Sequence, residues 1–216
     1  MTDHAQLAER TIGAYLEKLS SSDPAPGGGS VAGLVGALAA GLGQMVVSLT
    51  LKGGNHAPLA DHVKTLGAAR ASLLAAAAAD ERAYSAYVDA TRLPKSTDGE
   101  RAERRTAMQS AIVHAASVPL ILAEAACGLL TELGPVVRDG TAYALADAEI
   151  AVGLAHASVA AGLVTVRVNI PLIKDEAKAG SLAAQADMVE RRADQEATSR
   201  RATLAQRRRY GVVGEG

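Results

Sequence analysis

Apolar residues recur at every third or fourth position along most of this chain, which is the spacing of one face of an α-helix. The clearest stripe runs through residues 58–91 and consists of Leu59, Val63, Leu66, Leu73, Ala77, Tyr84 and Tyr87. No segment alternates apolar and polar residues with the period of two that a half-buried strand requires. The pattern predicts an all-α protein.

One segment departs from the amphipathic pattern because it has no charged residue. It extends from Pro24 to Leu51 and begins Pro24-Ala25-Pro26-Gly27-Gly28-Gly29-Ser30. The prolines and glycines predict a loop, so a helix should not start before Gly29, and Ser30 is suited to cap it. The helix expected over residues 30–51 contains four glycines, each costing about 1 kcal/mol relative to alanine. Close packing on every side would offset that cost, which predicts that this Gly/Ala-rich helix is central.

Five further helices are expected from the remaining pattern. They cover residues 2–20, 58–91, 98–133 and 142–168, and a last one leads from Asp175 to about residue 209. Gly134-Pro135 should end the 98–133 helix and leave residues 136–141 irregular. Together these elements predict a multi-helix up-and-down bundle around the Gly/Ala-rich helix. The length suits a single domain over residues 1–216.

Two carboxylates fall on stripes that should face the core. Asp80 lies on the 58–91 stripe, and Asp147 lies on the 142–168 stripe. Burying an unpaired carboxylate costs several kcal/mol. Asp80 could instead lie at the rim of the bundle or pair with an arginine such as Arg70 or Arg104. Otherwise the two carboxylates meet in a polar pocket within the bundle. We favour a pocket near the start of the 30–51 helix, whose free amides suit an anion or a polar group.

Composition narrows the class of protein. The chain is 49% hydrophobic and 21% charged with a net charge of −1, so no electrostatic argument favours nucleic acid. Its one cysteine, Cys127, excludes an internal disulfide framework and suits the cytoplasm. Phe and Trp are absent, so each helix buries little area, which favours a homodimer. Residues 24–51 are long enough to cross a bilayer, but their prolines and glycines, and the charges in the other helices, argue against a membrane.

Several kinds of chemistry lack a motif. The five histidines include no pair at i,i+4 and have no cysteine nearby, so no metal site is expected. Walker, dinucleotide and Gly-x-Ser-x-Gly motifs are absent, so the sequence gives no support for an NTPase, a nicotinamide enzyme or a serine hydrolase.

Residues 24–30, which we call the glycine loop, and the segments after it resemble the cyclodeaminase and methenyltetrahydrofolate cyclohydrolase family. The helical domain of this family also occurs fused to formiminotransferases. The matching segments cover nearly the whole chain in the family's order. They are residues 24–30, Asp80 with Tyr84, Leu93-Pro94-Lys95-x-Thr97-Asp98, Arg104 with Gln109, Val118-Pro119-Leu120, Asp147, Val166-Arg167-Val168-Asn169 and Asp175.

The resemblance implies an enzyme whose substrate is a tetrahydrofolate derivative carrying a one-carbon unit between N5 and N10. The reaction would be hydrolysis of 5,10-methenyltetrahydrofolate to 10-formyltetrahydrofolate, or else cyclisation of formiminotetrahydrofolate with release of ammonia. Both pass through a tetrahedral carbon between two nitrogens. Both therefore need a carboxylate beside the cation and a group that moves protons.

Candidate roles follow from the resemblance. Asp147 or Asp80 would face the cationic carbon and the pterin nitrogens, and Lys95 would transfer protons or bind the folate carboxylates. The other candidates are substrate-binding residues, namely Gly27, Gly28, Gly29 and Ser30 lining the pocket, with Arg104, Asn169 and Asp175 as further contacts. Helix capping, ion pairing or simple chain turning is the alternative role for each of them.

Some positions depart from the family's pattern. Gly140-Thr141 replaces Gly-Asn, Ala146-Asp147 replaces Ser-Asp, and the asparagine usual near Thr165 is missing. The lysine-rich turn after the Gly/Ala-rich helix is reduced to Lys52-Gly53-Gly54. These changes leave open a substrate other than folate, or a non-catalytic helical scaffold.

Overall fold

The computed structural model describes residues 4–54 and 57–211. Within these ranges the chain forms seven α-helices and three short 3-10 turns, without a strand. The helices are α1 (His4–Glu9), α2 (Ile12–Leu19), α3 (Gly28–Lys52), α4 (Ala60–Arg92), α5 (Asp98–Asp139), α6 (Leu145–Asn169) and α7 (Glu176–Gly211). The 3-10 turns are Ala57–Leu59, Ala142–Ala144 and Ile170–Leu172. The predicted all-α class is confirmed.

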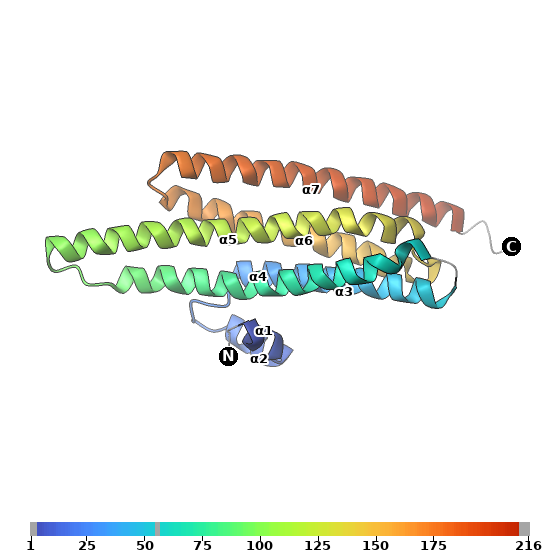
Figure 1. The fold of residues 1–216 in the computed structure, drawn as a ribbon, viewed down its shortest axis with the longest axis horizontal. Helices are drawn as coiled ribbons and strands as arrows, with labels where there is room; N and C mark the ends of the chain where they lie inside the picture. The colour runs from blue at the N-terminus through green and yellow to red at the C-terminus, as the bar shows by residue number, and fades with distance from the viewer. Residues whose placement is uncertain (1–3, 55–56, 212–216) are drawn as a thin grey trace.

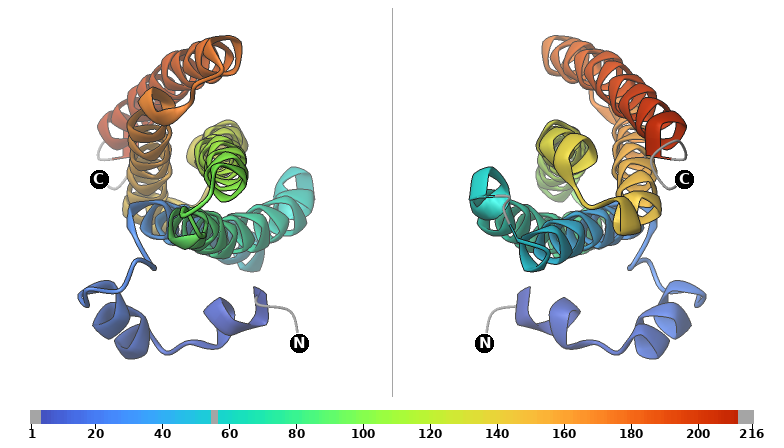
Figure 2. Two further views of the ribbon diagram at one scale, coloured as in Figure 1. Left: turned by 90° about the vertical axis from the view of Figure 1, so that its left-hand side faces the viewer. Right: turned by 90° about the vertical axis from the view of Figure 1, so that its right-hand side faces the viewer.

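The five long helices, α3 to α7, form an up-and-down bundle in which consecutive helices reverse direction (Figure 1). Seen end-on, α7, α6, α3 and α4 form an arc and α5 lies inside it (Figure 2). α5 accordingly packs against all four of the others. The short helices α1 and α2 lie outside the arc, where α1 contacts α4.

The glycines of α3 allow close packing, as the sequence predicts. A Cβ at Gly33 would lie 2.7 Å from the Ala77 Cβ of α4, and a Cβ at Gly36 would lie 2.7 Å from the Ser158 hydroxyl of α6. α3 is therefore pressed between α4 and α6. The packing does not surround it, however, because the side chains on its outer side remain exposed within one chain, with Leu38 54% and Leu49 43% accessible.

α3 begins earlier than expected, and Ser30 does not cap it. The helix starts at Gly28, after an extended Gly27 that provides no side-chain cap. Ser30 lies in the first turn and is completely buried. Its hydroxyl donates to Glu81 Oε1 of α4 at 2.8 Å, so it is committed to a tertiary contact instead of the helix end.

The helix expected over residues 2–20 is interrupted. Thr11 adopts an extended conformation and its hydroxyl accepts a hydrogen bond from the Ala14 amide at 3.1 Å. This side-chain cap starts α2 as a separate helix, because it satisfies an amide that a continuous helix would have bonded to its own backbone.

The predicted end of a helix at Gly134-Pro135 is wrong, since α5 continues to Asp139. The extra turn buries Val136 and Val137 completely. Arg207 of α7 donates to the carbonyl oxygens of Val137, at 2.7 Å, and Gly140, at 2.5 Å. Tertiary burial and these hydrogen bonds outweigh the backbone bond that Pro135 removes.

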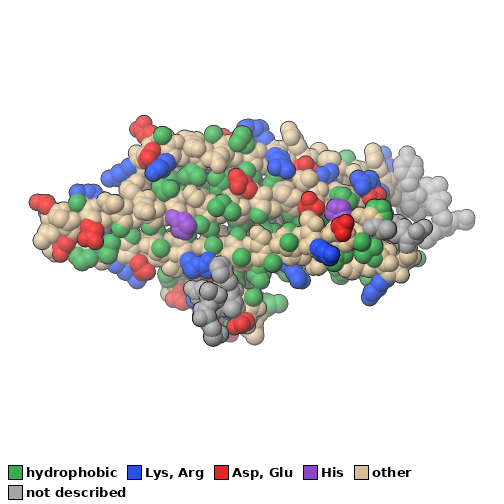
Figure 3. Space-filling model, viewed as in Figure 1, with side chains coloured by type: hydrophobic (Ala, Val, Ile, Leu, Met, Phe, Trp, Pro, Cys, Tyr) green, Lys and Arg blue, Asp and Glu red, His purple; other side chains and the backbone are tan. Residues whose placement is uncertain are grey.

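Charged side chains of both signs are spread along the bundle face formed by α4, α5 and α7 (Figure 3). No large area of one sign appears on this face. The absence of a nucleic-acid partner stays a prediction from the composition.

Candidate active site

A pocket of about 340 Å³ lies where the start of α3 meets α4 and the end of α6. Its walls come from the loop before α3, from these three helices and from α5, which contributes Ala115. They comprise Pro24, Ala25, Gly27, Gly28, Gly29, Asp80, Glu81, Tyr84, Ala115, Val164, Thr165, Val168 and Asn169. The volume is at the lower end of the roughly 300–1,000 Å³ range of small-molecule sites.

Asp80 is the buried acidic group of this pocket. Only 8% of the residue is exposed, and its carboxylate accepts a hydrogen bond from the backbone amide of Ser30. The first amides of α3 have no partner within the helix, and they carry the positive end of its dipole. The structure therefore places a carboxylate against a helix N-terminus, where negative charge is stabilised.

Gly29 makes this approach possible. A Cβ at position 29 would lie 2.2 Å from Asp80 Oδ1 and 2.3 Å from the Asp80 carboxyl carbon. Only glycine leaves room for the carboxylate so close to the backbone. The glycine run of the loop thus serves a packing need at one particular residue.

The pKa of Asp80 is raised from 3.8 to about 6. Burial is the main cause, because it disfavours the charged form, and the negative charge of Glu81 adds to it. The hydrogen bond from the Ser30 amide acts in the opposite direction. A carboxyl group with this pKa can accept and return a proton near neutral pH.

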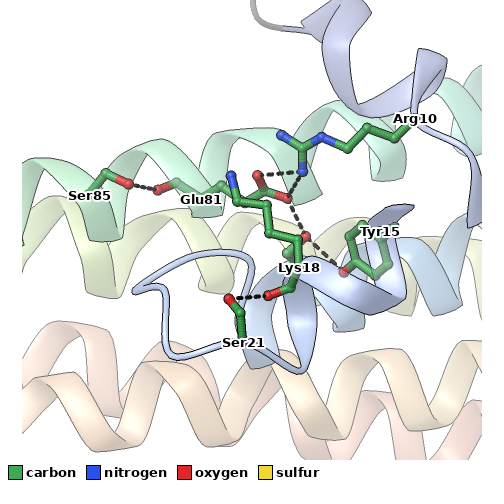
Figure 4. A network of polar contacts seen from close by, with 7 residues as sticks. Arg10, Tyr15, Lys18, Ser21, Glu81 and Ser85 are labelled. Carbon is green, nitrogen blue, oxygen red and sulfur yellow. Dashed lines mark hydrogen bonds and ion pairs between the residues drawn. The ribbon is translucent and has the colours of Figure 1, made fainter. Parts of the chain in front are cut away.

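A polar network supports the pocket from behind (Figure 4). The Ser30 hydroxyl is 3.1 Å from the Tyr15 hydroxyl and donates to Glu81, and Arg10 pairs with Glu81 at 3.1 Å. Burial raises the pKa of the Tyr15 phenol, so the phenol remains neutral. This network joins α2, α3 and α4 at the point where Asp80 is held.

Of the predicted site residues, Gly27, Gly28, Gly29, Asp80 and Asn169 line this pocket. The Asn169 side-chain amide donates to the Ala115 carbonyl at 2.8 Å, which fixes its position on the wall. Ser30 lies directly behind the wall, where it supports Asp80 and Glu81.

The expected convergence of Asp80 and Asp147 is wrong. The Asp147 stripe does not face the core either, because Tyr143 and Ile150 on the same stripe are exposed within one chain. Asp147 lies in the first turn of α6, eighteen residues before Thr165, which lines the pocket. Asp147 and Thr165 are therefore about 27 Å apart along the axis of α6. α3 and α6 are antiparallel, as the Ser158 hydroxyl bonds to Ala32 near the start of α3 and the Thr141 amide bonds to Thr50 near its end. Asp147 is therefore beside the far end of α3.

Three other candidates also lie outside the pocket. Lys95 is exposed in the loop between α4 and α5. Arg104 donates to the Thr91 carbonyl at 3.0 and 2.8 Å, which ties α5 to the end of α4. Asp175 accepts from the Lys178 amide at 3.1 Å and so caps the start of α7. Within one chain these three residues have structural contacts, and their catalytic or binding roles stay untested predictions.

The sequence analysis missed Glu81, Arg10 and Tyr15. Glu81 is adjacent to Asp80 but lies off the apolar stripe, and Arg10 and Tyr15 belong to the segment expected as one helix. Their contribution depends on how α1 and α2 fold back, which helical spacing does not reveal. In the described ranges no cluster of three or more His, Cys, Asp or Glu could hold a metal, and the expectation of a metal-free site stays a prediction.

These features define an all-α bundle with a small-molecule pocket that encloses a carboxyl group titrating near neutral pH. Residues 11–188 match the family described as formiminotransferase-cyclodeaminase. The chain belongs to this family, which confirms the resemblance found in the sequence.

Two relatives show how much of each protein is shared. The chain is 33% identical to methenyltetrahydrofolate cyclohydrolase of Methylorubrum extorquens, over 78% of this chain and 83% of the relative. It is 32% identical to formimidoyltransferase-cyclodeaminase of Rattus norvegicus over 79% of this chain, but the match covers 32% of the rat protein. The chain thus spans about a third of the length of the animal relative.

A solved structure extends the likeness to the whole fold. The crystal structure of formiminotetrahydrofolate cyclodeaminase from Thermotoga maritima superposes with a TM-score of 0.82 at 25% sequence identity. The alignment covers 93% of this chain and 98% of the other.

Proposed function

We propose that this protein is a folate one-carbon enzyme that hydrolyses 5,10-methenyltetrahydrofolate to 10-formyltetrahydrofolate. The observation that carries the proposal is Asp80, a buried carboxyl group with a pKa of about 6 at the wall of a pocket. The Methylorubrum extorquens relative, of which the match covers 83%, is named a methenyltetrahydrofolate cyclohydrolase.

Asp80 would serve the reaction in two steps. As a carboxylate it stabilises the cationic methenyl carbon and accepts a proton from water as the water oxygen bonds to that carbon. The neutral tetrahedral adduct then loses its bond to N5, which receives the proton from Asp80. The hydroxyl proton of the adduct leaves to solvent as the carbonyl of the N10-formyl product forms, so one proton is released in each turnover.

Formiminotetrahydrofolate cyclisation is the second candidate, and it is favoured by the name of the solved relative. In that reaction N10 bonds to the carbon of the protonated formimino group, and Asp80 passes the N10 proton to the amino nitrogen. That nitrogen departs as ammonia and leaves the cationic methenyl carbon between N5 and N10. The same carboxyl group in the same pocket serves both reactions, since each moves one proton around a tetrahedral carbon.

The test measures the loss of near-ultraviolet absorption of 5,10-methenyltetrahydrofolate above its spontaneous rate. We expect Asp80→Asn to lower kcat by at least a hundredfold, because general acid–base catalysis contributes roughly 10²- to 10⁴-fold. Asp147→Asn is the matched control and should keep the wild-type rate, since Asp147 is at the far end of α6.

Other outcomes decide among the alternatives. Ammonia release from formiminotetrahydrofolate without hydrolysis of the methenyl compound would assign the cyclodeaminase reaction. The absence of both activities in the wild type would reject the folate enzyme and leave a non-folate substrate or a scaffold.

We also propose a homodimer formed through the outer side of α3 and α6. Apolar side chains are exposed along both helices, namely Leu38, Met45 and Leu49 of α3 and Ile150, Val164 and Val168 of α6. The two helices lie side by side and turn their buried faces towards α5. Their exposed apolar side chains therefore lie on the same outer side of the bundle. A second copy packed on this side would remove these side chains from water.

A lipid bilayer, instead of a second copy of the chain, is the alternative partner for this apolar surface. By length and composition α3, α5 and the segment 142–172 could each cross a membrane. Against this, α6 is joined to the highly charged α7 by Arg167, which pairs with Asp187 and Glu190. Because α7 follows the length of the bundle, a membrane around α6 would also enclose these charges at high cost. This argument supports a soluble dimer, and we propose the cytoplasm as its location.

A further inference from the structure

A second cavity, of about 290 Å³, lies beside the Asp80 pocket between α1, α2 and α4. The two cavities share Pro24, Ala25 and Glu81 as lining residues. They are therefore two compartments separated by the start of the glycine loop and one side chain of α4. A molecule longer than the Asp80 pocket could extend from one compartment into the other.

The second cavity differs from the first in its charge. Three basic side chains line it, Arg10, Lys18 and Arg82, against two acidic ones, Asp23 and Glu81. Arg10 is paired with Glu81, and Figure 4 shows Arg10 and Lys18 extending towards Glu81 from the N-terminal segment. The first compartment, in contrast, has no lysine or arginine among its lining residues.

Arg82 is the least satisfied of these cations. Its Nη1 is buried and finds no hydrogen-bond partner among the described residues. A buried guanidinium N–H without a partner is costly, and a carboxylate is the group that best fits the guanidinium fork. Lys18 likewise forms no ion pair within the described part of the chain, and it is exposed at the edge of the cavity.

We infer that this second compartment binds the carboxylates at the glutamate end of the folate, with Arg82 and Lys18 as the binding residues. The inference rests on the proposed function, which places the pterin end and the one-carbon unit beside Asp80. The chemical logic is complementary. Asp80, which forms no ion pair among the described residues, would lie beside the cationic carbon. Arg82 and Lys18, which also form no ion pair there, would lie beside the anionic glutamate. This assignment replaces Lys95, which lines neither compartment.

The experiment compares two substrates that differ only at the tail. 5,10-Methenyltetrahydropteroate has the pterin, the one-carbon unit and the aminobenzoyl group of 5,10-methenyltetrahydrofolate but lacks the glutamate. For the wild type we expect KM to be at least tenfold lower with the folate than with the pteroate, at similar kcat. Arg82→Gln should raise KM for the folate about tenfold or more and leave KM for the pteroate unchanged.

Two more variants separate binding from folding. Lys18→Gln lies on the exposed side of α2 and should reduce the tail preference without affecting the fold. Arg105→Gln, an exposed arginine of α5, is the matched control and should behave as wild type. Equal effects of Arg82→Gln on both substrates would overturn the inference, because removing the tail and removing its partner must be non-additive if they interact.

An inhibition experiment distinguishes a subsite for the glutamate end of the folate from a site that binds any free anion. Glutarate, a free dicarboxylate, should compete with the folate only at millimolar concentrations, since it lacks the pterin end. Potent inhibition by glutarate of both substrates would place an independent anion site there and overturn the assignment.

The inference and the proposed function fail in different ways. Turnover of both substrates with equal KM rejects the tail subsite and keeps the enzyme. If neither substrate is turned over, calorimetry with tetrahydrofolate and tetrahydropteroate replaces kinetics. Tail-dependent binding that Arg82→Gln abolishes would then support the subsite alone, and the absence of binding would reject both.

Discussion

At the scale of single residues, the burial of Asp80 has opposite effects on the stability of the fold and on the proposed chemistry. Its burial against α3 costs free energy whenever the carboxyl group is charged, yet the same burial brings its pKa to about 6. Functional groups are often held in environments that the fold alone would not favour. Asp80 should therefore lower stability while it supports turnover.

This trade-off gives a pH-dependent prediction for stability. The folded-state pKa of Asp80 lies above the ordinary 3.8, so the folded protein binds this proton more tightly than the unfolded chain. The associated stability is fully present below pH 4 and is lost as the pH rises through 6, by roughly 3 kcal/mol at most. Asp80→Asn should therefore be more stable than wild type by about 1–3 kcal/mol at pH 8, and close to wild type at pH 4.

Urea unfolding at both pH values, at one protein concentration, measures the difference. Asp147→Asn, which removes a carboxylate in the first turn of α6, is the matched control. If Asp80→Asn is no more stable than wild type at pH 8, the Asp80 carboxylate is well solvated or paired in the folded protein.

At the scale of elements, the decisive feature is the start of α3. Its first turn lies against the Asp80 carboxylate at Gly29, and its buried Ser30 hydroxyl donates to Glu81 of α4. The helix N-terminus thus acts as a fixed support whose position depends on α4 approaching within side-chain contact. The lack of a Cβ at one residue permits that approach.

Gly29→Ala tests this support. The added Cβ would overlap the Asp80 carboxylate, so either the side chain or the helix start must move. We expect a loss of about 1–3 kcal/mol in stability and at least a tenfold loss of kcat. Thermal unfolding and the methenyltetrahydrofolate assay measure the two effects.

Gly128→Ala is the matched control, because a Cβ there meets no atom within 4 Å. It should leave activity unchanged and stabilise α5 by up to about 1 kcal/mol. Wild-type behaviour of Gly29→Ala would show that Asp80 can relax without consequence.

At the scale of the whole molecule, the bundle has one side that the chain does not cover. α5 is enclosed by the arc of helices, whereas α3 and α6 keep apolar stripes on the outer side. Small side chains bury little area in each helix pair, so a second copy would add a substantial share of the core. Val164 and Val168 of this surface also line the Asp80 pocket, which places the site at the edge of the proposed dimer.

The double variant Leu38→Glu/Leu49→Glu tests the dimer. Both side chains are exposed in one chain, so the charges should not disturb a monomer but should repel across a dimer interface. We expect the wild type to sediment as a dimer at micromolar concentration and the variant as a helical monomer. Leu93→Glu, an exposed leucine of the α4–α5 loop, should stay dimeric, and a monomeric wild type would reject the proposal.

The sequence by itself determined the helical class, the long helices α4 and α6, the inward position of Asp80 and the family. These features depend on local spacing and on short motifs, which a single chain displays directly. It could not determine that α1 and α2 separate at Thr11, or that α5 passes Pro135. Those outcomes depend on hydrogen bonds and burial between segments far apart in sequence.

Only the tertiary structure decided which carboxylate belongs to the pocket. Asp80 and Asp147 look alike in the sequence because both fall on apolar stripes that were expected to face the core. The Asp147 stripe, which includes Ile150 and Val164, is instead the exposed side of α6. The antiparallel packing of α3 and α6 puts one beside the start of α3 and the other at its opposite end. Helical periodicity specifies which side chains share one side of a helix. It specifies neither whether that side is buried nor the height of a residue along the bundle relative to another helix. That height is set by the loops and by the contacts between helices, and it determines which residues can act on one ligand.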